Sequence, residues 1–371
     1  MPEPDKLTVA LGARSYDIVI GEGVLAGAGG HIAAVAPNRP VVVVTDENVA
    51  ALHLATVRTS LTEAGVAARE IVVPPGEHTK DFEHLEWLID RLLEPGISRD
   101  TLIVALGGGV VGDLAGFAAA IVLRGLDFAQ LPTTLLAQVD SSVGGKTGIN
   151  TRVGKNLVGS FHQPVLVLAD TDVLDTLPRR ELLAGYAEVV KYGLIDDAEF
   201  FAWLESNGAA AIAGDAAARR YIIATCCAAK ARVVAEDERE TGRRVLLNLG
   251  HTFAHALEAE AGFGDELLHG EAVAIGIVMA FELSVRMNLC APKDLARVQR
   301  HFESGGLAIA PPASGGRDWD AHALLAHMAH DKKAFAGRPT FVLARGIGQA
   351  FLQREVDTDQ ILDVLEQAAA A

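Results

Sequence analysis

The sequence predicts an α/β domain built on a parallel sheet, followed by a mainly helical domain. The chain has 371 residues, more than a single hydrophobic core normally spans. In the first half, short apolar runs alternate with helical patterns, which is typical of a parallel sheet covered by helices. From about Pro178 the sequence is alanine-rich and helical. We therefore expect domains at residues 1–178 and 179–371.

Three apolar runs in the first half predict buried strands, at residues 40–46, 69–74 and 102–106. Residues 82–93 between them have a helical pattern. In the second half the main strand signal comes late, at residues 339–344. The ligand site of such a sheet is expected at the carboxyl ends of its strands.

A glycine-rich turn, residues 107–113, follows the third predicted strand and leads into an alanine-rich helix. It contains the pattern G-x-G-x-x-G, and bare amides at a helix N-terminus can face a phosphate group. Alone this pattern is weak evidence, because a glycine turn can also serve packing. The turn is therefore a candidate phosphate site with a structural alternative.

Two further glycine-rich stretches contain lysines, at residues 132–150 and 153–156. Lys146 and Lys155 each lie beside glycine, so backbone amides and an ammonium group can approach an anion together. The alternative is that both lysines are ordinary loop charges. Their repetition within ten residues favours a phosphate cradle.

Composition excludes several classes of partner. The formal net charge of −16 argues against nucleic acid or an anionic membrane as the main partner. No run of apolar residues is long enough to span a membrane, and the first residues lack a signal pattern, so we expect a cytoplasmic protein. Three cysteines, two of them adjacent, indicate buried apolar residues rather than a disulfide framework.

Three histidines in the second half suggest part of a metal site. His251 and His255 lie at i, i+4 on a predicted helix, and His269 begins another apolar helix, at residues 271–281. Imidazole nitrogens suit zinc, cobalt or iron, and a carboxylate is a usual third ligand. The alternative is that these histidines cap helices or make buried hydrogen bonds.

A carboxylate for this site can come from Glu188, which lies on an apolar helical stretch with Lys191 three residues later. A surface ion pair is the alternative for these two residues. We nominate Glu188 as the third ligand.

Many motifs in one order resemble the 3-dehydroquinate synthase family. The matching stretches are residues 75–80, 107–113, 123–125, 132–150, 154–156, 161–164, 187–192, 247–255, 269–273 and 331–333. The resemblance implies a Rossmann-like NAD-binding domain (1–178), a helical metal- and substrate-binding domain (179–371) and a homodimer. It also implies a lyase of the shikimate pathway that converts 3-deoxy-D-arabino-heptulosonate 7-phosphate to 3-dehydroquinate and phosphate. A ring hydroxyl is transiently oxidised by NAD, phosphate is eliminated, the ketone is reduced again and an intramolecular aldol reaction closes the ring.

The resemblance also assigns residues. Glu188, His251 and His269 match ligands of a divalent zinc or cobalt ion, which removes His255 from the initial pair. Positions that match NAD contacts are Asp46, Glu77, Lys80, Gly109, Val110, Val111, Gly112, Asp113, Thr133, Thr134, Lys146, Lys155 and Thr176. Positions that match the substrate pocket are Arg124, Asp140, Lys146, Lys155, Asn156, Lys191, Lys230, Arg244, Asn248, His255, Lys332 and Lys333.

Two other functions stay open on the sequence. A metal-dependent polyol or alcohol dehydrogenase has a similar architecture but needs fewer cations for phosphate. A related cyclase, acting on sedoheptulose 7-phosphate or on an amino analogue of the substrate, is chemically closer.

Overall fold

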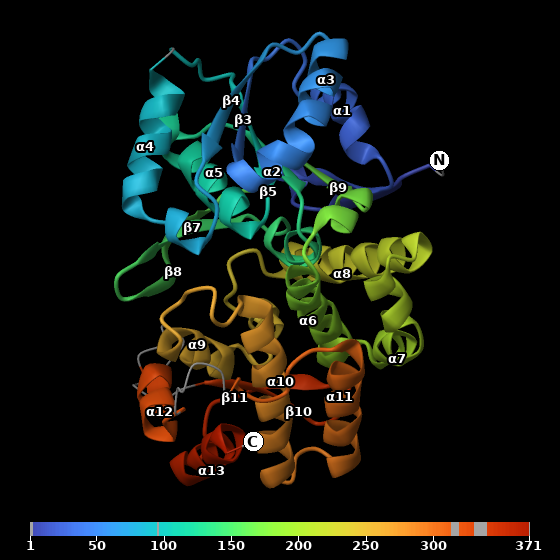
Figure 1. Ribbon diagram of the computed structural model, residues 1–371, viewed down its shortest axis with the longest axis vertical. Coiled ribbons are helices and arrows are strands. Elements are labelled where there is room, and N and C mark those ends of the chain that lie inside the picture. The colour runs from blue at the N-terminus through green and yellow to red at the C-terminus, as the bar shows by residue number, and fades with distance from the viewer. Residues whose placement is uncertain (1–2, 95, 313–318, 330–339, 371) are drawn as a thin grey trace. The chain divides into compact units, whose positions relative to one another are not determined.

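The computed structural model describes residues 3–94, 96–312, 319–329 and 340–370 (Figure 1). The chain forms two compact units. The first contains residues 1–178 and 214–239, and the second contains residues 179–213 and 240–371. The segment 214–239, which follows the domain boundary drawn from the sequence, thus packs with the first unit.

The first unit is built on a seven-stranded sheet with the order β1-β2-β9-β6-β5-β3-β4. Its strands are β1 (Asp5–Val9), β2 (Tyr16–Gly21), β3 (Val41–Asp46), β4 (Ala68–Val73), β5 (Leu102–Gly107), β6 (Phe128–Pro132) and β9 (Leu166–Asp170). Only β1 runs antiparallel to its neighbour; the other pairs are parallel. The three strands expected from apolar runs are β3, β4 and β5, so the prediction of a parallel sheet is confirmed.

The direction of chain winding reverses between β3 and β5. From β3 the chain moves outward to the edge strand β4, and then returns to the other side of β3 as β5. Asp46 ends β3 and Gly107 ends the neighbouring β5. Carboxyl ends at such a reversal are where open α/β sheets bind ligands. The residues expected to bind a nucleotide therefore follow the strands on both sides of this point.

Helices cover the sheet of the first unit. They are α1 (Ala28–Val35), α2 (Glu47–Val49), α3 (Ala55–Glu63), α4 (Phe82–Leu93), α5 (Gly109–Ile121) and α8 (Ala216–Glu236). α4 has the bounds predicted from the sequence. Its buried face, Leu85, Leu88 and Leu92, belongs to one core with α5 and the strands β3, β4 and β5.

A β-hairpin outside the main sheet packs on α5. It is formed by β7 (Lys146–Thr151) and β8 (Gly154–Phe161). The contact is close: a Cβ atom on Gly116 of α5 would lie 2.5 Å from Cγ2 of Thr147. Any larger residue at 116 would therefore push the hairpin away from the helix.

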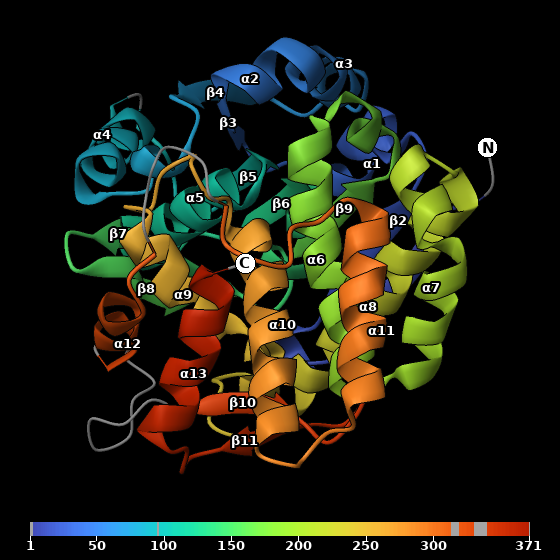
Figure 2. The same cartoon turned by 60° about the horizontal axis from the view of Figure 1, so that its bottom comes forward.

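The second unit consists mainly of helices, as predicted. They are α6 (Arg179–Asp196), α7 (Ala198–Ala213), α9 (His251–Glu260), α10 (His269–Arg286), α11 (Pro292–Gly305), α12 (Ala321–Ala329) and α13 (Thr358–Ala369). α10, most of whose residues are buried, packs against α6, α9, α11 and α13, and Figure 2 shows it between α13 and α11. The late strand signal corresponds to β10 (Phe341–Ala344), which pairs with β11 (Ala350–Gln353).

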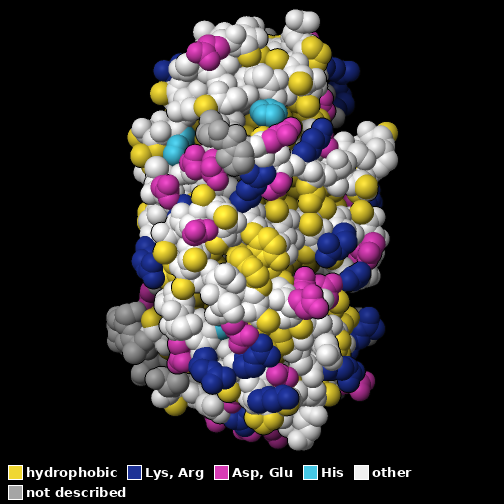
Figure 3. Space-filling view, turned by 90° about the vertical axis from the view of Figure 1, so that its right-hand side faces the viewer, with side chains coloured by type: hydrophobic (Ala, Val, Ile, Leu, Met, Phe, Trp, Pro, Cys, Tyr) yellow, Lys and Arg dark blue, Asp and Glu magenta, His cyan; other side chains and the backbone are white. Residues whose placement is uncertain are grey.

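The surface carries charges of both signs. On the face drawn in Figure 3, Lys and Arg side chains lie among Asp and Glu side chains rather than in a separate field. Among the described residues, no helix is both long enough and apolar enough to cross a membrane. All three cysteines are buried thiols, as predicted, and burial raises the pKa of Cys227 to about 12.

Candidate metal centre and nucleotide loops

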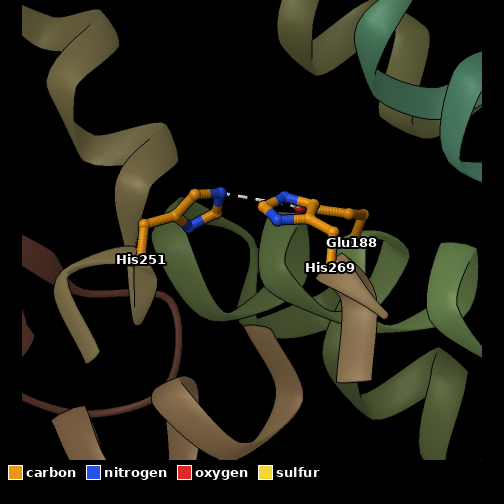
Figure 4. A group of neighbouring side chains, drawn as sticks. All are labelled: Glu188, His251 and His269. Carbon is orange, nitrogen blue, oxygen red and sulfur yellow. Dashed lines mark ion pairs between the residues drawn. The ribbon is translucent and has the colours of Figure 1, made fainter. Parts of the chain in front are cut away.

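Glu188, His251 and His269 come together from three helices of the second unit. Glu188 lies in the middle of α6, whereas His251 and His269 are the first residues of α9 and α10. Oε1 of Glu188 lies 3.6 Å from Nε2 of His251 and 3.5 Å from Nε2 of His269. Figure 4 shows both imidazoles directed toward the carboxylate. One ligand atom from each residue lies within 4.8 Å of the other two.

These distances fit a divalent ion. Ligand atoms about 2.1 Å from a tetrahedral zinc ion lie about 3.4 Å from one another, close to the separations between the carboxylate and each imidazole. Two imidazoles and one carboxylate are also the donor set of catalytic sites that leave a position open for substrate. The geometry therefore supports His269, rather than His255, as the second histidine beside His251 and Glu188.

Glycines allow the three helices to approach this closely. A Cβ atom on Gly270 would lie 1.9 Å from the carbonyl oxygen of Ala184, so α10 begins directly against the backbone of α6. One on Gly276 would lie 2.3 Å from the carbonyl oxygen of Gly250, where α10 meets the start of α9. Gly250 also has φ of +79°, which favours glycine. The spacing of the ligands thus depends on backbone contacts without side chains between them.

The second nitrogen of each imidazole has a partner of its own. Nδ1 of His251 lies 3.2 Å from the carbonyl oxygen of Leu249, and Nδ1 of His269 lies 3.2 Å from Oε2 of Glu258. Such partners leave Nε2 as the ligand atom. Burial lowers the pKa of His269, but the carboxylates of Glu258 and Glu188 outweigh it and raise the pKa to about 10.

Glu258 was not identified from the sequence. Its side chain is buried, on the same helix as His251 and seven residues further along. Seven residues are two turns of a helix, so Glu258 lies on the same face of α9 as His251. A carboxylate on this mostly apolar face could have been recognised from the sequence.

Lys191 and Glu188 form an ion pair that is buried, each side chain being 1 % exposed. The surface ion pair considered as an alternative is therefore excluded. Two charges are tolerated in the core only when they are paired, and Glu188 also faces the two imidazoles.

His255 lies one turn along α9 from His251. Its ring centroid is 5.6 Å from that of His251 and 6.5 Å from that of His269. It therefore borders the cluster without belonging to the set of three ligand atoms.

Arg244 and Asn248 lie on η8 (Arg243–Asn248), the segment before α9. Arg244 is 1 % exposed, which the sequence did not indicate. Nδ2 of Asn248 donates to Oε1 of Glu240 at 2.7 Å and to the carbonyl oxygen of Val245 at 3.0 Å. Glu240 is a second carboxylate that the sequence interpretation missed; no spacing pattern marked it.

In the first unit, the glycine turn leads into α5 as predicted. α5 begins at Gly109, and its first turn has neither a side-chain cap nor an acidic residue. A Cβ atom on Gly108 would lie 3.0 Å from Cγ2 of Thr134, and one on Gly109 would lie 3.2 Å from Oγ of Ser141. Uncapped amides beside bare glycines fit the pyrophosphate of a dinucleotide.

Lys80 and Asp113 connect two of the predicted nucleotide loops. Nζ of Lys80 lies 2.6 Å from Oδ2 of Asp113 and 3.8 Å from Oε1 of Glu77. Burial raises the pKa of Asp113, although Lys80 acts in the opposite direction. Burial likewise raises the pKa of Asp46, whose Oδ1 accepts from the amide of Val49.

The predicted threonines also follow strands of this sheet. Thr133 and Thr134 come directly after β6, and Oγ1 of Thr134 accepts from the amide of Ala137 at 3.1 Å. Thr176 ends η7 (Asp172–Thr176) after β9, and its Oγ1 lies 3.0 Å from Nε2 of His53.

The predicted substrate residues of the first unit lie on several elements. Lys146, Lys155 and Asn156 are on the β7–β8 hairpin, and Arg124 is exposed at the end of η5 (Val122–Arg124) with φ of +70°. Lys230 of α8 donates to the carbonyl oxygen of Asp140 at 2.7 Å and forms an ion pair with its carboxylate. Lys332 and Lys333 lie outside the described residues.

Comparison with known proteins decides the family. The 3-dehydroquinate synthase N-terminal family matches residues 70–184, and the 3-dehydroquinate synthase C-terminal family matches residues 185–334. A 3-dehydroquinate synthase of Rhodospirillum rubrum is 63% identical over 365 residues, covering 98% of this chain and 95% of the relative. The chain belongs to the 3-dehydroquinate synthase family. The predicted function, a carbon–oxygen lyase acting on phosphate, is thereby confirmed.

Solved structures extend beyond this family. The 2-epi-5-epi-valiolone synthase of Streptomyces hygroscopicus subsp. jinggangensis 5008, with NAD+ and Zn2+ bound, has a TM-score of 0.87 and 29% identity and covers 96% of this chain and 97% of its own. A 2-deoxy-scyllo-inosose synthase complexed with carbaglucose-6-phosphate, NAD+ and Co2+ has a TM-score of 0.87, 26% identity and coverage of 98% and 100%. An iron-containing alcohol dehydrogenase of Thermotoga maritima (TM-score 0.68, 17% identity, coverage 96% and 98%) shares the fold alone. The fold therefore does not separate the 3-dehydroquinate synthase family from dehydrogenases, whereas the sequence does.

Proposed function

We propose that the residues described above carry out the 3-dehydroquinate synthase reaction with one divalent metal ion and with NAD as a cofactor that is restored in each turnover. The substrate is 3-deoxy-D-arabino-heptulosonate 7-phosphate, and the products are 3-dehydroquinate and inorganic phosphate. The observation that carries the proposal is the cluster of Glu188, His251 and His269, whose three ligand atoms lie within 4.8 Å of one another.

The α/β domain, which the sequence places at residues 1–178, is proposed to bind NAD. The reversal of winding at β3 and β5 and the uncapped start of α5 support this assignment. Gly109 to Asp113 would lie at the pyrophosphate, and the polar side chains at the neighbouring strand ends would hold the rest of the dinucleotide. The latter are Asp46, Glu77, Lys80, Thr133, Thr134 and Thr176.

The helical domain, residues 179–371, is proposed to bind the metal ion. Glu188, His251 and His269 would be its ligands, and both zinc and cobalt suit this donor set. Two structural neighbours bear Zn2+ and Co2+, each together with NAD+. When bound, the ion supplies a Lewis acid and the dinucleotide a reversible hydride acceptor.

The lysines and arginines are proposed to hold the anionic substrate. It carries a phosphate and a carboxylate, so a protein with a net charge of −16 needs local cations to bind it. The proposed residues of the first unit are Arg124, Asp140, Lys146, Lys155, Asn156 and Lys230, and those of the second unit are Lys191, Arg244, Asn248, His255, Lys332 and Lys333.

Within this set the side chains have different tasks. Lys146 and Lys155 would neutralise the phosphate in place and as it leaves, because an ammonium group on a glycine-rich hairpin can approach it closely. His255 borders the metal cluster, where an imidazole can assist proton transfer to or from the substrate. The same lysines and histidine can act in several steps of the reaction, because each step needs the anionic substrate held in one position.

We also propose that the protein is a cytoplasmic homodimer, as the family resemblance implies. Sedimentation equilibrium of the purified protein tests the dimer, since a single species of 39.0 kDa would contradict it.

The proposed reaction is tested with less than one equivalent of NAD per substrate. Metal-loaded protein is incubated with the heptulosonate phosphate and sub-stoichiometric NAD, while inorganic phosphate and the absorbance of reduced nicotinamide are followed together. We expect many equivalents of phosphate per NAD and no accumulation of NADH. NADH that grows in proportion to product would indicate a dehydrogenase, and phosphate release from sedoheptulose 7-phosphate alone would indicate another cyclase.

A further inference from the structure

The β7–β8 hairpin is irregular where the proposed substrate residues lie. The two strands pair regularly up to Ile149 and Val158, and the next pair is Thr151 with Gly154. Between these pairs β8 contains residues 155–157, whereas β7 contains the single residue Asn150. An extra segment of this kind interrupts the ladder and redirects side chains. Lys155 and Asn156 lie in this segment.

Asn150 makes the contacts that the interrupted ladder lacks. Its Oδ1 accepts from the backbone amide of Asn156 at 3.0 Å. Asn156 has φ of +55°, a conformation that asparagine tolerates better than most residues but that needs support from its surroundings. The side chain of Asn150 therefore fixes the segment opposite it.

The same residue is bonded to the loop before α4. Nδ2 of Asn150 donates to Oε1 of Glu77 at 2.7 Å, and its backbone amide donates to the carbonyl oxygen of Lys80 at 2.7 Å. Lys80 in turn is paired with Asp113 at the start of α5. Asn150 thus joins the loop of Glu77 and Lys80 to the hairpin segment of Lys155 and Asn156.

We propose that Asn150 is a positioning residue that holds the NAD-binding loop and the phosphate-binding segment in register. The inference rests on the proposed roles of Glu77 and Lys80 toward NAD, and of Lys155 and Asn156 toward the substrate. A carboxamide suits this position because one group must donate to a carboxylate while it accepts from an amide. Aspartate retains the acceptor only, and alanine retains neither.

Two substitutions at position 150 distinguish the contact with Glu77 from the contact with Asn156. Asn150→Ala removes both side-chain contacts, so we expect KM for the heptulosonate phosphate and the dissociation constant of NAD each to rise about five- to tenfold. Asn150→Asp keeps the acceptor for the amide of Asn156 but faces the carboxylate of Glu77. We therefore expect Asn150→Asp to weaken NAD binding as much as Asn150→Ala does, but to have a KM for the heptulosonate phosphate close to that of the unsubstituted protein.

A double-mutant cycle tests whether Asn150 acts on NAD through Glu77. Glu77→Ala, Asn150→Ala and the double variant are each titrated with NAD. If Asn150 acts on NAD only by orienting Glu77, the double variant should bind NAD no more weakly than whichever single variant has the lower NAD affinity. If the loss of NAD affinity in the double variant equals the product of the losses in the two single variants, Asn150 acts independently of Glu77, and that result would overturn the proposal.

Val153→Ala is the matched control, because Val153 lies at the tip of the same hairpin and is 86% exposed. It should change neither constant. A purely structural role of Asn150 would appear as a lowered melting temperature with both constants unchanged, and that result would contradict the proposal. The NAD titrations need no turnover, so they test Asn150 even if the heptulosonate phosphate proves not to be the substrate.

Discussion

The two clusters of ionisable side chains are built in opposite ways. In the helical unit, Glu188, His251 and His269 project from three helices whose backbones touch at glycines. In the α/β unit, Glu77 and Lys80 lie between β4 and α4, Asp113 lies in the second turn of α5, and side-chain contacts join the three. The first cluster is fixed by helix packing, and the second by a network of hydrogen bonds. Substitutions in the first cluster should therefore change the free energy of unfolding and metal affinity, and substitutions in the second should change binding and kinetic constants.

The largest effect is expected on the hairpin of the α/β unit. Lys146→Met and Lys155→Met should each lower kcat/KM by several orders of magnitude, because a charge needed at the leaving phosphate is lost. If both were ordinary loop charges, each would matter by less than about 1 kcal/mol. Steady-state kinetics and thermal melting of the same samples decide between these outcomes. A change confined to melting would contradict the proposed role.

The next effect tests how the helical cluster is held. Gly250→Ala should lower the free energy of unfolding by roughly 3 kcal/mol, since its Cβ atom would lie 2.5 Å from the amide nitrogen of Ile277. Gly262→Ala is the control: φ is similar, +77°, but nothing lies within 4 Å of the added atom. The difference between the two variants in chemical denaturation measures the helix contact alone. Equal losses would show that backbone conformation, not packing, dominates.

A smaller effect is expected from the carboxylate behind His269. Glu258→Gln should weaken metal binding by about 10- to 100-fold, because the partner that orients the imidazole loses its charge. Competition with a chelator of known affinity measures it. Glu260→Gln is the matched control on the same helix, since Glu260 pairs with His327 instead. A metal affinity that both variants lower equally would exclude a specific role for Glu258.

The smallest effect concerns the cysteines, which belong to neither cluster. Cys226 and Cys227 are buried, and burial raises the pKa of Cys227 to about 12. We expect no reaction of either thiol with a water-soluble disulfide reagent in the folded protein, and reaction of both after denaturation. Rapid reaction in the native state would show that this part of α8 opens.

The glycine turn beside Lys80, Glu77 and Asp113 was predictable from sequence, because its signal is local. Its glycines and the strand before them are visible in one short window. The roles of Lys80, Glu77 and Asp113 toward NAD came only from the family motifs. The bounds of α4, and those of β3, β4 and β5 to within one residue, were predicted because their signals are also local. The role of Asn150 was not, since it depends on the irregular pairing opposite it.

The helical cluster was only partly predictable. Spacing alone favoured His251 with His255, and the exchange of His255 for His269 came from the family motif. The reason is that α10 meets α9 and α6 through backbone contacts at Gly250, Gly270 and Gly276, which no periodicity reveals. Glu258 and Glu240 were missed because each acts on a neighbouring polar group rather than belonging to a motif.

We propose that the metal ion and NAD are held by separate clusters of side chains. It is tested by measuring metal content and NAD affinity for His269→Ala and Lys80→Ala. His269→Ala should lose the metal and bind NAD within a factor of about two of the unsubstituted protein, and Lys80→Ala should keep the metal and bind NAD more weakly. Full metal occupancy with normal turnover in His269→Ala, or loss of the metal in Lys80→Ala, would show that the two sites are not separate in this way.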